Sequence, residues 1–171
     1  PPDIFASRPW LNPANSRSTT STQATWLYGE FYVWQTSNMS WLMDRVVIVT
    51  RNAQDQPTEE ITQTPGQNGL ENSLRSTYTY PVPGEPWTEK LNQYWNGTGW
   101  EDDTRNINAY DAQGNQTVDL ELQWTGGAWD TTDGYFRDYL YNGNNQVTQY
   151  IEEVKNQSNP GFSLNRREIY S

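Results

Sequence analysis

Arginine returns along this chain at a nearly constant interval, and this recurrence constrains the fold more than any other feature. Successive members of the series are 30, 30, 32 and 29 residues apart: Arg45, Arg75, Arg105, Arg137 and Arg166. A bulky apolar residue precedes each of them, in the order Trp41, Leu70, Trp100, Trp129 and Phe162. Such a period indicates one small structural unit that is repeated, because each copy buries its surface against its neighbours.

The residues that follow the first four arginines predict a tight turn in each repeat. In the segment DAQG, Asp111 suits the first position of a type I turn and Gly114 suits the last. The segments NAQD (52–55) and NGNN (142–145) place Asn or Asp at the same positions. A tyrosine precedes three of the turns and a threonine follows four of them, in the two series Tyr80, Tyr110, Tyr141 and Thr58, Thr88, Thr117, Thr148.

Side chains on both sides of these turns alternate as they do in β-strands, so each repeat is predicted to be a hairpin. In YFRDYLY and VDLELQW the residues expected on a common face are Tyr135, Arg137, Tyr139, Tyr141 and Val118, Leu120, Leu122, Trp124, respectively. The expected fold class is all-β, an up-and-down antiparallel meander of about ten strands built from hairpin repeats. The strands are expected near 26–35, 42–51, 57–64, 73–81, 87–95, 103–111, 116–124, 134–142, 147–155 and 163–171.

The chain divides into two parts by composition. Residues 1–25 are rich in Pro, Ser, Thr and Asn and predict an extended N-terminal arm, whereas residues 26–171 predict a single β-repeat domain. Only 33% of the chain is hydrophobic, but nine Trp and eleven Tyr supply large side chains with a polar tip. Such residues bury considerable apolar area, so we expect the repeat domain to fold.

The acidic composition argues against several classes of partner. The formal net charge is −10, whereas binding to nucleic acid or to anionic lipid depends on clustered Lys and Arg. A spanning helix needs roughly 20 consecutive apolar residues, and no stretch approaches that length. We therefore expect no nucleic-acid partner and no membrane insertion.

Cysteine and histidine are both absent, which removes thiolate nucleophiles, imidazole bases and zinc-type ligand sets. The remaining catalytic option is a pair of carboxylates of the kind that hydrolyses glycosides. In Asp102/Asp103 and Glu152/Glu153 the two residues are adjacent in sequence, so we expect their side chains on opposite faces of the strand. Asp119 and Glu121 share a face, but that face has the pattern of a solvated surface. We predict that the chain is not an enzyme and uses no cofactor and no metal.

The repeated arginines and tryptophans have a structural and a functional interpretation. In the structural one, the arginines form a row with a spacing of about 9.6 Å, two strands apart, and stack on Trp or Tyr of neighbouring strands. In the functional one, exposed tryptophans at strand ends stack on sugar rings: Trp95, Trp100, Trp124 and Trp129. The structural interpretation is favoured, because repeat stacking requires equivalent contacts at each interface.

The segment AYDAQGNQT, residues 109–117, resembles the tyrosine-aspartate (YD) repeat of Rhs-like and other secreted bacterial surface proteins. The segment LYNGNNQVT, residues 140–148, resembles it more distantly, and the similarity is confined mainly to residues 95–156. Units of about 30 residues are longer than the usual YD unit. The resemblance implies a secreted or surface-exposed bacterial β protein without catalysis of its own, and it carries over no toxin or shell function.

The series of repeats starts and stops with half a unit. WLYGEFYVWQ (26–35) supplies a post-turn half with no partner before it, and SLNRREIYS (163–171) supplies a pre-turn half with no partner after it. These halves can join within one chain, which closes the sheet, or between chains, which gives a head-to-tail array. We expect the array, with the N-terminal arm adding a strand to a neighbouring copy.

The predicted function is therefore that of a structural subunit of a secreted extracellular filament or surface assembly, with copies of the chain itself as partners. The alternative is a monomeric carbohydrate-binding or adhesion module that uses the exposed tryptophans to bind glycans. The residues expected at the assembly contacts are Ile4, Phe5, Trp10, Leu11, Trp26, Tyr28, Phe31, Arg166, Ile169 and Tyr170.

Overall fold

Ten β-strands account for most of the chain that the computed structural model describes, which comprises residues 25–35, 39–155 and 161–170, with side chains from residue 28 onward. In chain order the strands are β1 (Thr25–Gln35), β2 (Ser40–Arg51), β3 (Pro57–Gly66), β4 (Gly69–Thr79), β5 (Glu89–Trp95), β6 (Trp100–Tyr110), β7 (Gln116–Trp124), β8 (Trp129–Tyr141), β9 (Val147–Lys155) and β10 (Ser163–Ile169). No helix occurs among the described residues.

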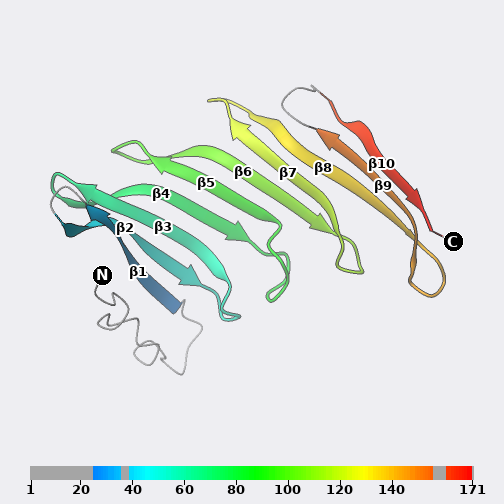
Figure 1. Ribbon diagram of the computed structural model, residues 1–171, viewed down its shortest axis with the longest axis horizontal. Helices are drawn as coiled ribbons and strands as arrows, with labels where there is room; N and C mark the ends of the chain where they lie inside the picture. Colours follow the sequence, from blue (N-terminus) through cyan, green and yellow to red (C-terminus); the bar gives the residue numbers. More distant parts are fainter. Residues whose placement is uncertain (1–24, 36–38, 156–160, 171) are drawn as a thin grey trace.

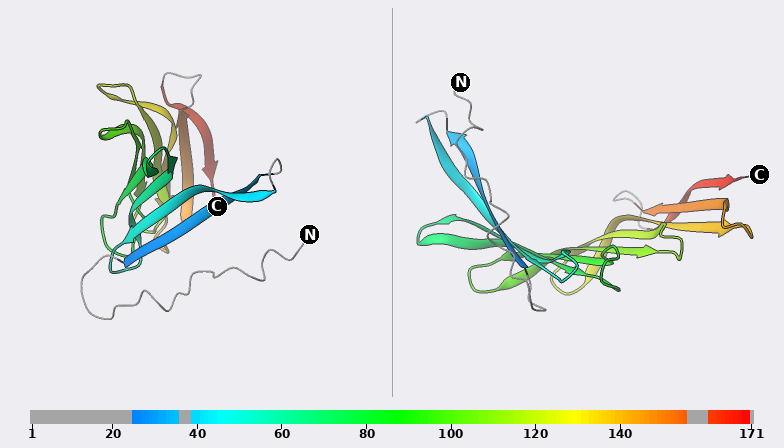
Figure 2. Two further views of the ribbon diagram at one scale, coloured as in Figure 1. Left: turned by 90° about the vertical axis from the view of Figure 1, so that its left-hand side faces the viewer. Right: turned by 90° about the horizontal axis from the view of Figure 1, so that it is seen from below.

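The strands form one sheet in the order β1 to β10, and every strand pairs antiparallel with its neighbours in sequence. Figure 1 shows this single layer, and Figure 2 shows the β1–β2 hairpin rising out of the layer that the later strands form. The expected all-β meander is confirmed. Because β1 and β10 are its two edges, the described sheet is open and does not close on itself. The predicted N-terminal arm lies outside the described residues, apart from Thr25, which begins β1.

Three turns at one end of the sheet share one geometry, which explains their similar sequences. Each begins with Asn or Asp, whose side-chain oxygen accepts backbone N–H groups two and four residues later, an arrangement that stabilises the turn. Asp111 accepts in this way from Gln113 at 2.9 Å and from Asn115 at 2.8 Å. The turns that begin at Asn52 and Asn142 contain the same two bonds. The fourth residue has a positive φ of 63°, 84° and 63° in Asp55, Gly114 and Asn145, respectively.

This turn geometry predicts a loss of stability when its first side chain is removed. Oδ1 of Asn142 accepts from the backbone N–H groups of Asn144 and Gln146 at 2.9 and 3.0 Å. We expect Asn142→Ala to lower the free energy of unfolding by about 1–2 kcal/mol, because both hydrogen bonds are lost. Asn142→Asp keeps the accepting oxygen and is the control, with an expected change within about 0.5 kcal/mol. Urea unfolding followed by tryptophan fluorescence measures both, and equal losses would show that the side chain does not hold the turn.

Irregularities of strand pairing recur with the repeat. Each hairpin that joins an odd-numbered strand to the next has one extra residue on its second strand, and the extra residue is short and polar: Asp44, Ser73, Asp103, Thr132 and Asn165. Such a β-bulge increases the local twist and changes the face that the following side chains occupy. A second set of bulges falls on members of the threonine series: Thr58, Thr117 and Thr148.

The register places the paired tryptophans on one face of the sheet and most of the tyrosines on the other, because paired residues share a face and side chains alternate along each strand; Tyr28 and Tyr32 of β1 lie on the same face as the tryptophans. One face, which we call the tryptophan face, also carries the aliphatic series Val118, Leu120 and Leu122; its tryptophans are Trp34, Trp41, Trp95, Trp100, Trp124 and Trp129. The other, the tyrosine face, carries the acidic residues Asp119 and Glu121; its tyrosines include Tyr78, Tyr94, Tyr135, Tyr139 and Tyr150.

The arginines do not form the single row that their period suggests, and that interpretation is wrong. Arg75 and Arg105 lie on the tryptophan face, whereas Arg45, Arg137 and Arg166 lie on the tyrosine face. The reason is that the arginines follow their bulges at distances that vary from one to five residues. Cation–π contacts do form, at 4.4, 5.1 and 3.6 Å from the ring centroid, in the pairs Arg45–Phe31, Arg75–Trp100 and Arg137–Tyr135.

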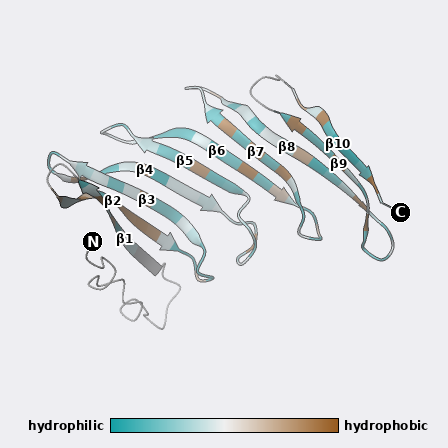
Figure 3. Ribbon diagram, in the orientation of Figure 1, coloured by the Kyte–Doolittle hydropathy of each residue, from teal (hydrophilic) through white to brown (hydrophobic). Residues whose placement is uncertain are grey.

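A single layer leaves little room for a core. In the part of the chain described, the buried apolar residues are Val46, Val49 and Leu122. Figure 3 shows strands that are largely hydrophilic with short apolar stretches. Cross-strand side-chain pairs, each contributing about 0.2–1 kcal/mol, must therefore supply much of the stability.

Candidate functional site

The two edge strands are the most accessible paired elements of the sheet. In the described sheet β1 and β10 each have a neighbour on one side only. On β1, Tyr28 and Phe31 are 46% and 43% exposed, and Ile169 on β10 is 71% exposed. Just beyond β10, Tyr170 is 48% exposed. An unpaired edge is a template for pairing with another chain, and these four residues, expected at assembly contacts, lie on or directly beside the two edges.

The β1–β2 hairpin carries the densest group of exposed apolar side chains. The large apolar residues of its strands that are exposed are Tyr28, Phe31, Tyr32, Val33, Trp34, Trp41 and Leu42. They are divided between the two faces, with Tyr28, Tyr32, Trp34 and Trp41 on the tryptophan face and Phe31, Val33 and Leu42 on the tyrosine face. Exposed apolar groups of this kind mark interaction sites. In the described sheet, the edge strand of this hairpin therefore pairs on one side only and exposes apolar side chains.

A carboxylate lies in the middle of the apolar edge on the tryptophan face. Glu30 accepts hydrogen bonds from the hydroxyls of Tyr28 and Tyr32 at 3.2 and 2.8 Å. The bond to Glu30 is the main cause that raises the pKa of Tyr32. For Tyr28, desolvation is the larger cause and the bond to Glu30 the second. Glu30 thus concentrates negative charge at the free edge of β1.

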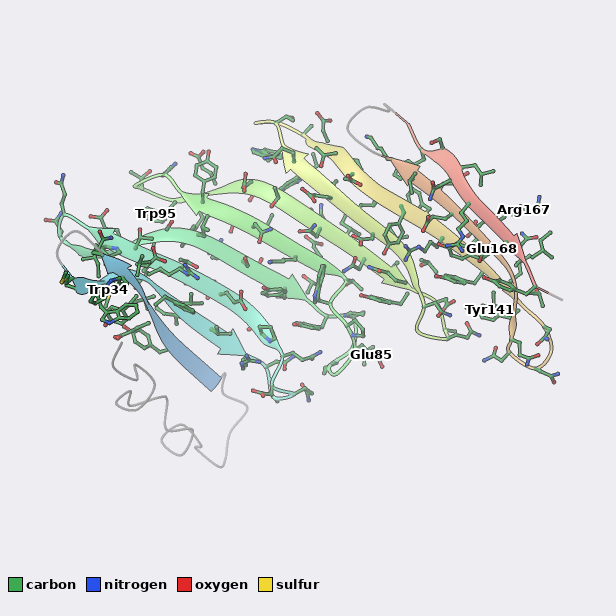
Figure 4. The ribbon with its side chains drawn as sticks, viewed as in Figure 1. Trp34, Glu85, Trp95, Tyr141, Arg167 and Glu168 are labelled. Carbon is green, nitrogen blue, oxygen red and sulfur yellow. The ribbon has the colours of Figure 1, made fainter. Side chains whose placement is uncertain are left out.

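The β10 edge carries charges of both signs. On the tyrosine face, Glu168 accepts hydrogen bonds from the Tyr170 hydroxyl and from Arg166, whose Nε lies 2.9 Å away. The bond from Tyr170 and then that from Arg166 lower the pKa of Glu168. On the tryptophan face, Arg167 donates to Gln149 at 3.3 Å. Figure 4 shows Arg167 and Glu168 along this edge of the sheet.

A buried carboxylate fixes β10 to the strands behind it. Glu152 on β9 accepts from Nε of Arg137 on β8 at 2.7 Å, from its neighbour Tyr150 at 2.6 Å and from the bulge residue Asn165 on β10 at 2.7 Å. The bond from Tyr150 and then the bond from Arg137 lower the pKa of Glu152 to about 2. One side chain therefore joins the last three strands.

The predicted sugar-stacking tryptophans contact one another. The ring centroids of Trp95 and Trp100 are 5.2 Å apart at an interplanar angle of 69°, and Trp124 and Trp129 form a similar pair at 5.2 Å. All four are half-buried, and the guanidinium of Arg75 lies over Trp100. Their packing within the sheet is thus shown, while sugar binding stays a prediction. Figure 4 places Trp34 and Trp95 at the strand ends opposite those near Glu85 and Tyr141.

An open hollow lies beside one of these pairs on the tryptophan face. It has a volume of about 470 Å³ and is lined by Gln63, Leu70, Glu71, Asn72, Trp95 and Gly97. In the repeat, Leu70 occupies the position that Trp41, Trp100 and Trp129 hold in other hairpins. The smaller leucine side chain explains why the row of aromatic residues is interrupted here.

The acidic pairs lie on the faces expected of them. Asp102 and Asp103 have separate partners, since Gln93 donates to the first at 2.7 Å and Gln123 donates to the second at 3.1 Å. Within the described residues, no three His, Cys, Asp or Glu side chains are grouped so that they could hold a metal ion. The same residues contain no helix with the length and apolar character needed to cross a membrane.

Several residues predicted at assembly contacts lie outside the part of the chain that the structure describes. Ile4, Phe5, Trp10 and Leu11 precede the described residues, and of Trp26 only the backbone, in β1, is described. Conversely, the sequence interpretation did not predict Glu30, Arg167 or Glu168, and it considered Glu152 only as a candidate acid and missed its structural role. The sequence does contain a pattern that indicates three of them: Glu30, Glu152 and Glu168 each have a tyrosine two residues away, and a strand places residues two apart on one face.

Comparison with known proteins identifies no family for the chain: no protein-family model matches it, and no curated protein matches it. One solved structure that it resembles is the crystal structure of a protein of unknown function from Bacteroides fragilis. The two chains are 14% identical and superpose with a TM-score of 0.44 over 84% of this chain and 92% of the other.

Proposed function

We propose that this chain is a structural subunit of an extracellular or cell-surface assembly, in which β10 of one copy pairs with β1 of the next. The observation that carries the proposal is the open single-layer sheet with two unpaired, exposed edge strands. Native proteins usually cover, charge or shorten such edges because they promote association. Here β1 has 11 residues and exposes aromatic side chains, which suits an edge strand that pairs with another copy.

Edge pairing also accounts for the repeat itself. An added copy continues the sequence of hairpins, so that each junction between copies resembles the junctions within one chain. The extracellular or surface location is inferred from the resemblance of residues 109–117 to YD repeats. The prediction that the chain is not an enzyme is retained. Asp102 and Asp103 are engaged with amide side chains, and Glu152 and Glu153 lie on opposite faces of the sheet.

The proposal is tested by the size of the full chain in solution and by electron microscopy of the product. At about 0.15 M salt, repulsion between copies of charge −10 is screened beyond about 8 Å. We expect concentration-dependent ribbons in which each copy adds about 48 Å along the sheet, since ten strands lie about 4.8 Å apart. A full chain that stays monomeric at every concentration would overturn the proposal.

Arg167→Pro is a variant aimed at the free edge. The N–H of Tyr170 donates to the carbonyl of Thr148 on β9 at 2.9 Å, so alternation directs the N–H of Arg167 away from β9. Proline at 167 therefore keeps the β9 bonds and removes a donor from the free edge. We expect assembly to be lost, whereas Arg167→Thr, which keeps the N–H, retains part of it. Assembly by the proline variant at the wild-type level would contradict pairing through β10.

Deletion of residues 1–24 tests the predicted role of the arm. If the arm adds a strand to a neighbouring copy, its removal reduces assembly. If instead the shortened chain assembles and the full chain does not, residues 1–24 occupy the β1 edge of their own chain, and the proposal is wrong.

The hollow beside Trp95 favours a second candidate function, carbohydrate binding. It combines an aromatic ring with the amide side chains of Gln63 and Asn72, a mixture of apolar and polar lining that suits a sugar. Glycan-array screening of the native chain and of Trp95→Ala tests this function. Saccharide binding by a monomer that is abolished in Trp95→Ala would favour the binding module over the assembly subunit.

A further inference from the structure

Resting on the proposed head-to-tail assembly, we infer that the junction between copies has one register, in which Arg167 lies opposite Tyr32 of the next copy and its guanidinium bonds Glu30 of that copy. The partner is therefore a second copy of this chain. The register follows from a rule that the hairpins obey within one molecule, described next.

The rule relates the bulge of one hairpin to the first strand of the following hairpin. Arg75, two residues after the bulge residue Ser73, lies opposite Gln93 of the next hairpin. The bulge of that hairpin falls between Asn92 and Gln93 on its first strand, and Gln93 is the second of these two residues. The same relation holds in two other junctions, where the opposite residues are Val46 with Gln63 and Arg105 with Leu122. Three of the four internal junctions thus share one register.

Applied to the last bulge, the rule specifies the junction between copies. The bulge residue of the last hairpin is Asn165, and two residues later comes Arg167. In the first hairpin the bulge falls between Phe31 and Tyr32 on the first strand, so the second of the two residues is Tyr32. Arg167 is therefore placed opposite the next copy's Tyr32, Glu168 opposite Phe31 and Ile169 opposite Glu30.

The fourth internal junction supplies the competing register. Between β8 and β9, Gly134 lies opposite Lys155, two residues beyond the position that the rule predicts, Glu153. If the junction between copies followed this variant, Arg167 would lie opposite the next copy's Trp34. The two registers keep every side chain on the same face and differ in which charges meet.

Charge favours the first register. Within the chain, Arg75 and Arg105 each contact a glutamate that lies diagonally across the hairpin on the tryptophan face, at 3.9 Å from Glu59 and 2.9 Å from Glu89. In the first register Glu30 of the next copy lies diagonal to Arg167 in the same sense. A diagonal neighbour is within reach of a long side chain. The competing register separates Arg167 from Glu30 by two further residues.

The tyrosine face supplies a second complementary contact. In the first register Glu168 lies opposite the next copy's Phe31, over whose ring the guanidinium of Arg45 lies at 4.4 Å. The carboxylate of Glu168 therefore approaches a cation that, within its own copy, bonds the exposed carboxylate of Asp44. Opposite charges meet on both faces of the junction, which fixes orientation as well as register.

Cysteine cross-linking distinguishes the two registers, since the chain contains no cysteine of its own. Residues directly opposite in an antiparallel pair lie within the Cα separation that a disulfide spans, about 4.4–6.8 Å. We expect the double variant Tyr32→Cys/Arg167→Cys to form, on mild oxidation, a ladder of cross-linked multimers on a non-reducing gel. The matched control Trp34→Cys/Arg167→Cys tests the competing register and should form few multimers.

The outcomes separate this inference from the proposed function. If ribbons form and the Trp34 variant cross-links instead of the Tyr32 variant, the register is wrong but the assembly stands. If ribbons form and neither variant cross-links, pairing of β10 with β1 is wrong. If no ribbons form from the full chain, the proposed function fails, and the inference fails with it.

A charge exchange gives a second measurement that does not depend on disulfide geometry. We expect Glu30→Lys and Arg167→Glu each to lower the amount of assembled protein about tenfold, the change that 1.4 kcal/mol produces. The double variant should recover most of the wild-type assembly, because the pair is restored with its signs reversed. Single variants that assemble normally, or a double variant as defective as the singles, would overturn the predicted contact.

Discussion

Gly134→Ala is expected to lower the free energy of unfolding by about 2–5 kcal/mol, the sum of backbone strain and overpacking. Gly134 has a φ of 145°, which L side chains rarely adopt. A Cβ at this position would lie 2.3 Å from the carbonyl oxygen of Asp119 and 2.9 Å from Cα of Leu120. Backbone atoms of β7 cannot move away without breaking the pairing between β7 and β8. Urea unfolding monitored by circular dichroism measures the loss.

Gly143→Ala is the matched control for this substitution. It makes the same chemical change in the turn that follows β8, where a Cβ would meet no atom within 4 Å. Its expected effect is within about 0.5 kcal/mol, as for other surface substitutions. Equal effects of the two substitutions would show that the close approach of β7 and β8 at Gly134 does not limit stability.

Glu152→Gln is the substitution with the second large expected effect, a loss of about 3 kcal/mol at pH 7. The side chain of Glu152 is 12% exposed and bonds Arg137, so the neutral amide leaves a partly buried guanidinium without its counter-charge. The magnitude agrees with the depression of the pKa of Glu152 from 4.5 to about 2, at about 1.4 kcal/mol per unit. Because the carboxylate joins β8, β9 and β10, hydrogen exchange should accelerate mainly in these strands.

The pH dependence of this effect follows from the direction of the pKa shift. Folding lowers the pKa of Glu152, so its contribution is fully present above the unfolded value of about 4.5 and is lost as the pH falls through about 2. The difference in stability between the wild type and Glu152→Gln should therefore shrink across this interval. A difference that stays constant from pH 7 to pH 2 would show that ionisation of Glu152 does not stabilise the sheet.

Glu153→Gln serves as the control for charge alone. Glu153 is the adjacent residue, lies on the opposite face and is exposed. The substitution changes the net charge by the same amount, and its expected effect is within about 0.5 kcal/mol. A comparable loss in both variants would assign the effect to net charge and not to the bonds of Glu152.

The meander and its turns could be predicted from the sequence because their signals are local. The Asn and Asp residues that begin the turns bond the backbone within four residues, so Asp111 and Asn142 identify their turns without any knowledge of the rest of the chain. The alternation of Val118, Leu120 and Leu122 likewise depends only on the geometry of one strand.

The face of the sheet on which each arginine lies could not be predicted from the sequence, because it depends on the positions of the β-bulges. One extra residue reverses the face of everything that follows it, and its position is set by pairing with another strand. Arg105 and Arg137 both belong to a regular series, yet Thr132 is an extra residue of the pairing between β7 and β8 and the two arginines lie on opposite faces. For the same reason the role of Glu152 was missed: its partners Arg137 and Asn165 come from two other strands.

The number of strands has a consequence for how copies of the sheet can be joined. The chain contributes ten alternating strands, an even number, so its first and last strands run in opposite directions. A copy displaced along the sheet by simple translation therefore presents an antiparallel neighbour, and the six cross-strand-paired tryptophans of every copy would line the same side of a polymer. Nine or eleven strands would bring like-directed strands together at every seam, with a different hydrogen-bond pattern from the one used everywhere else.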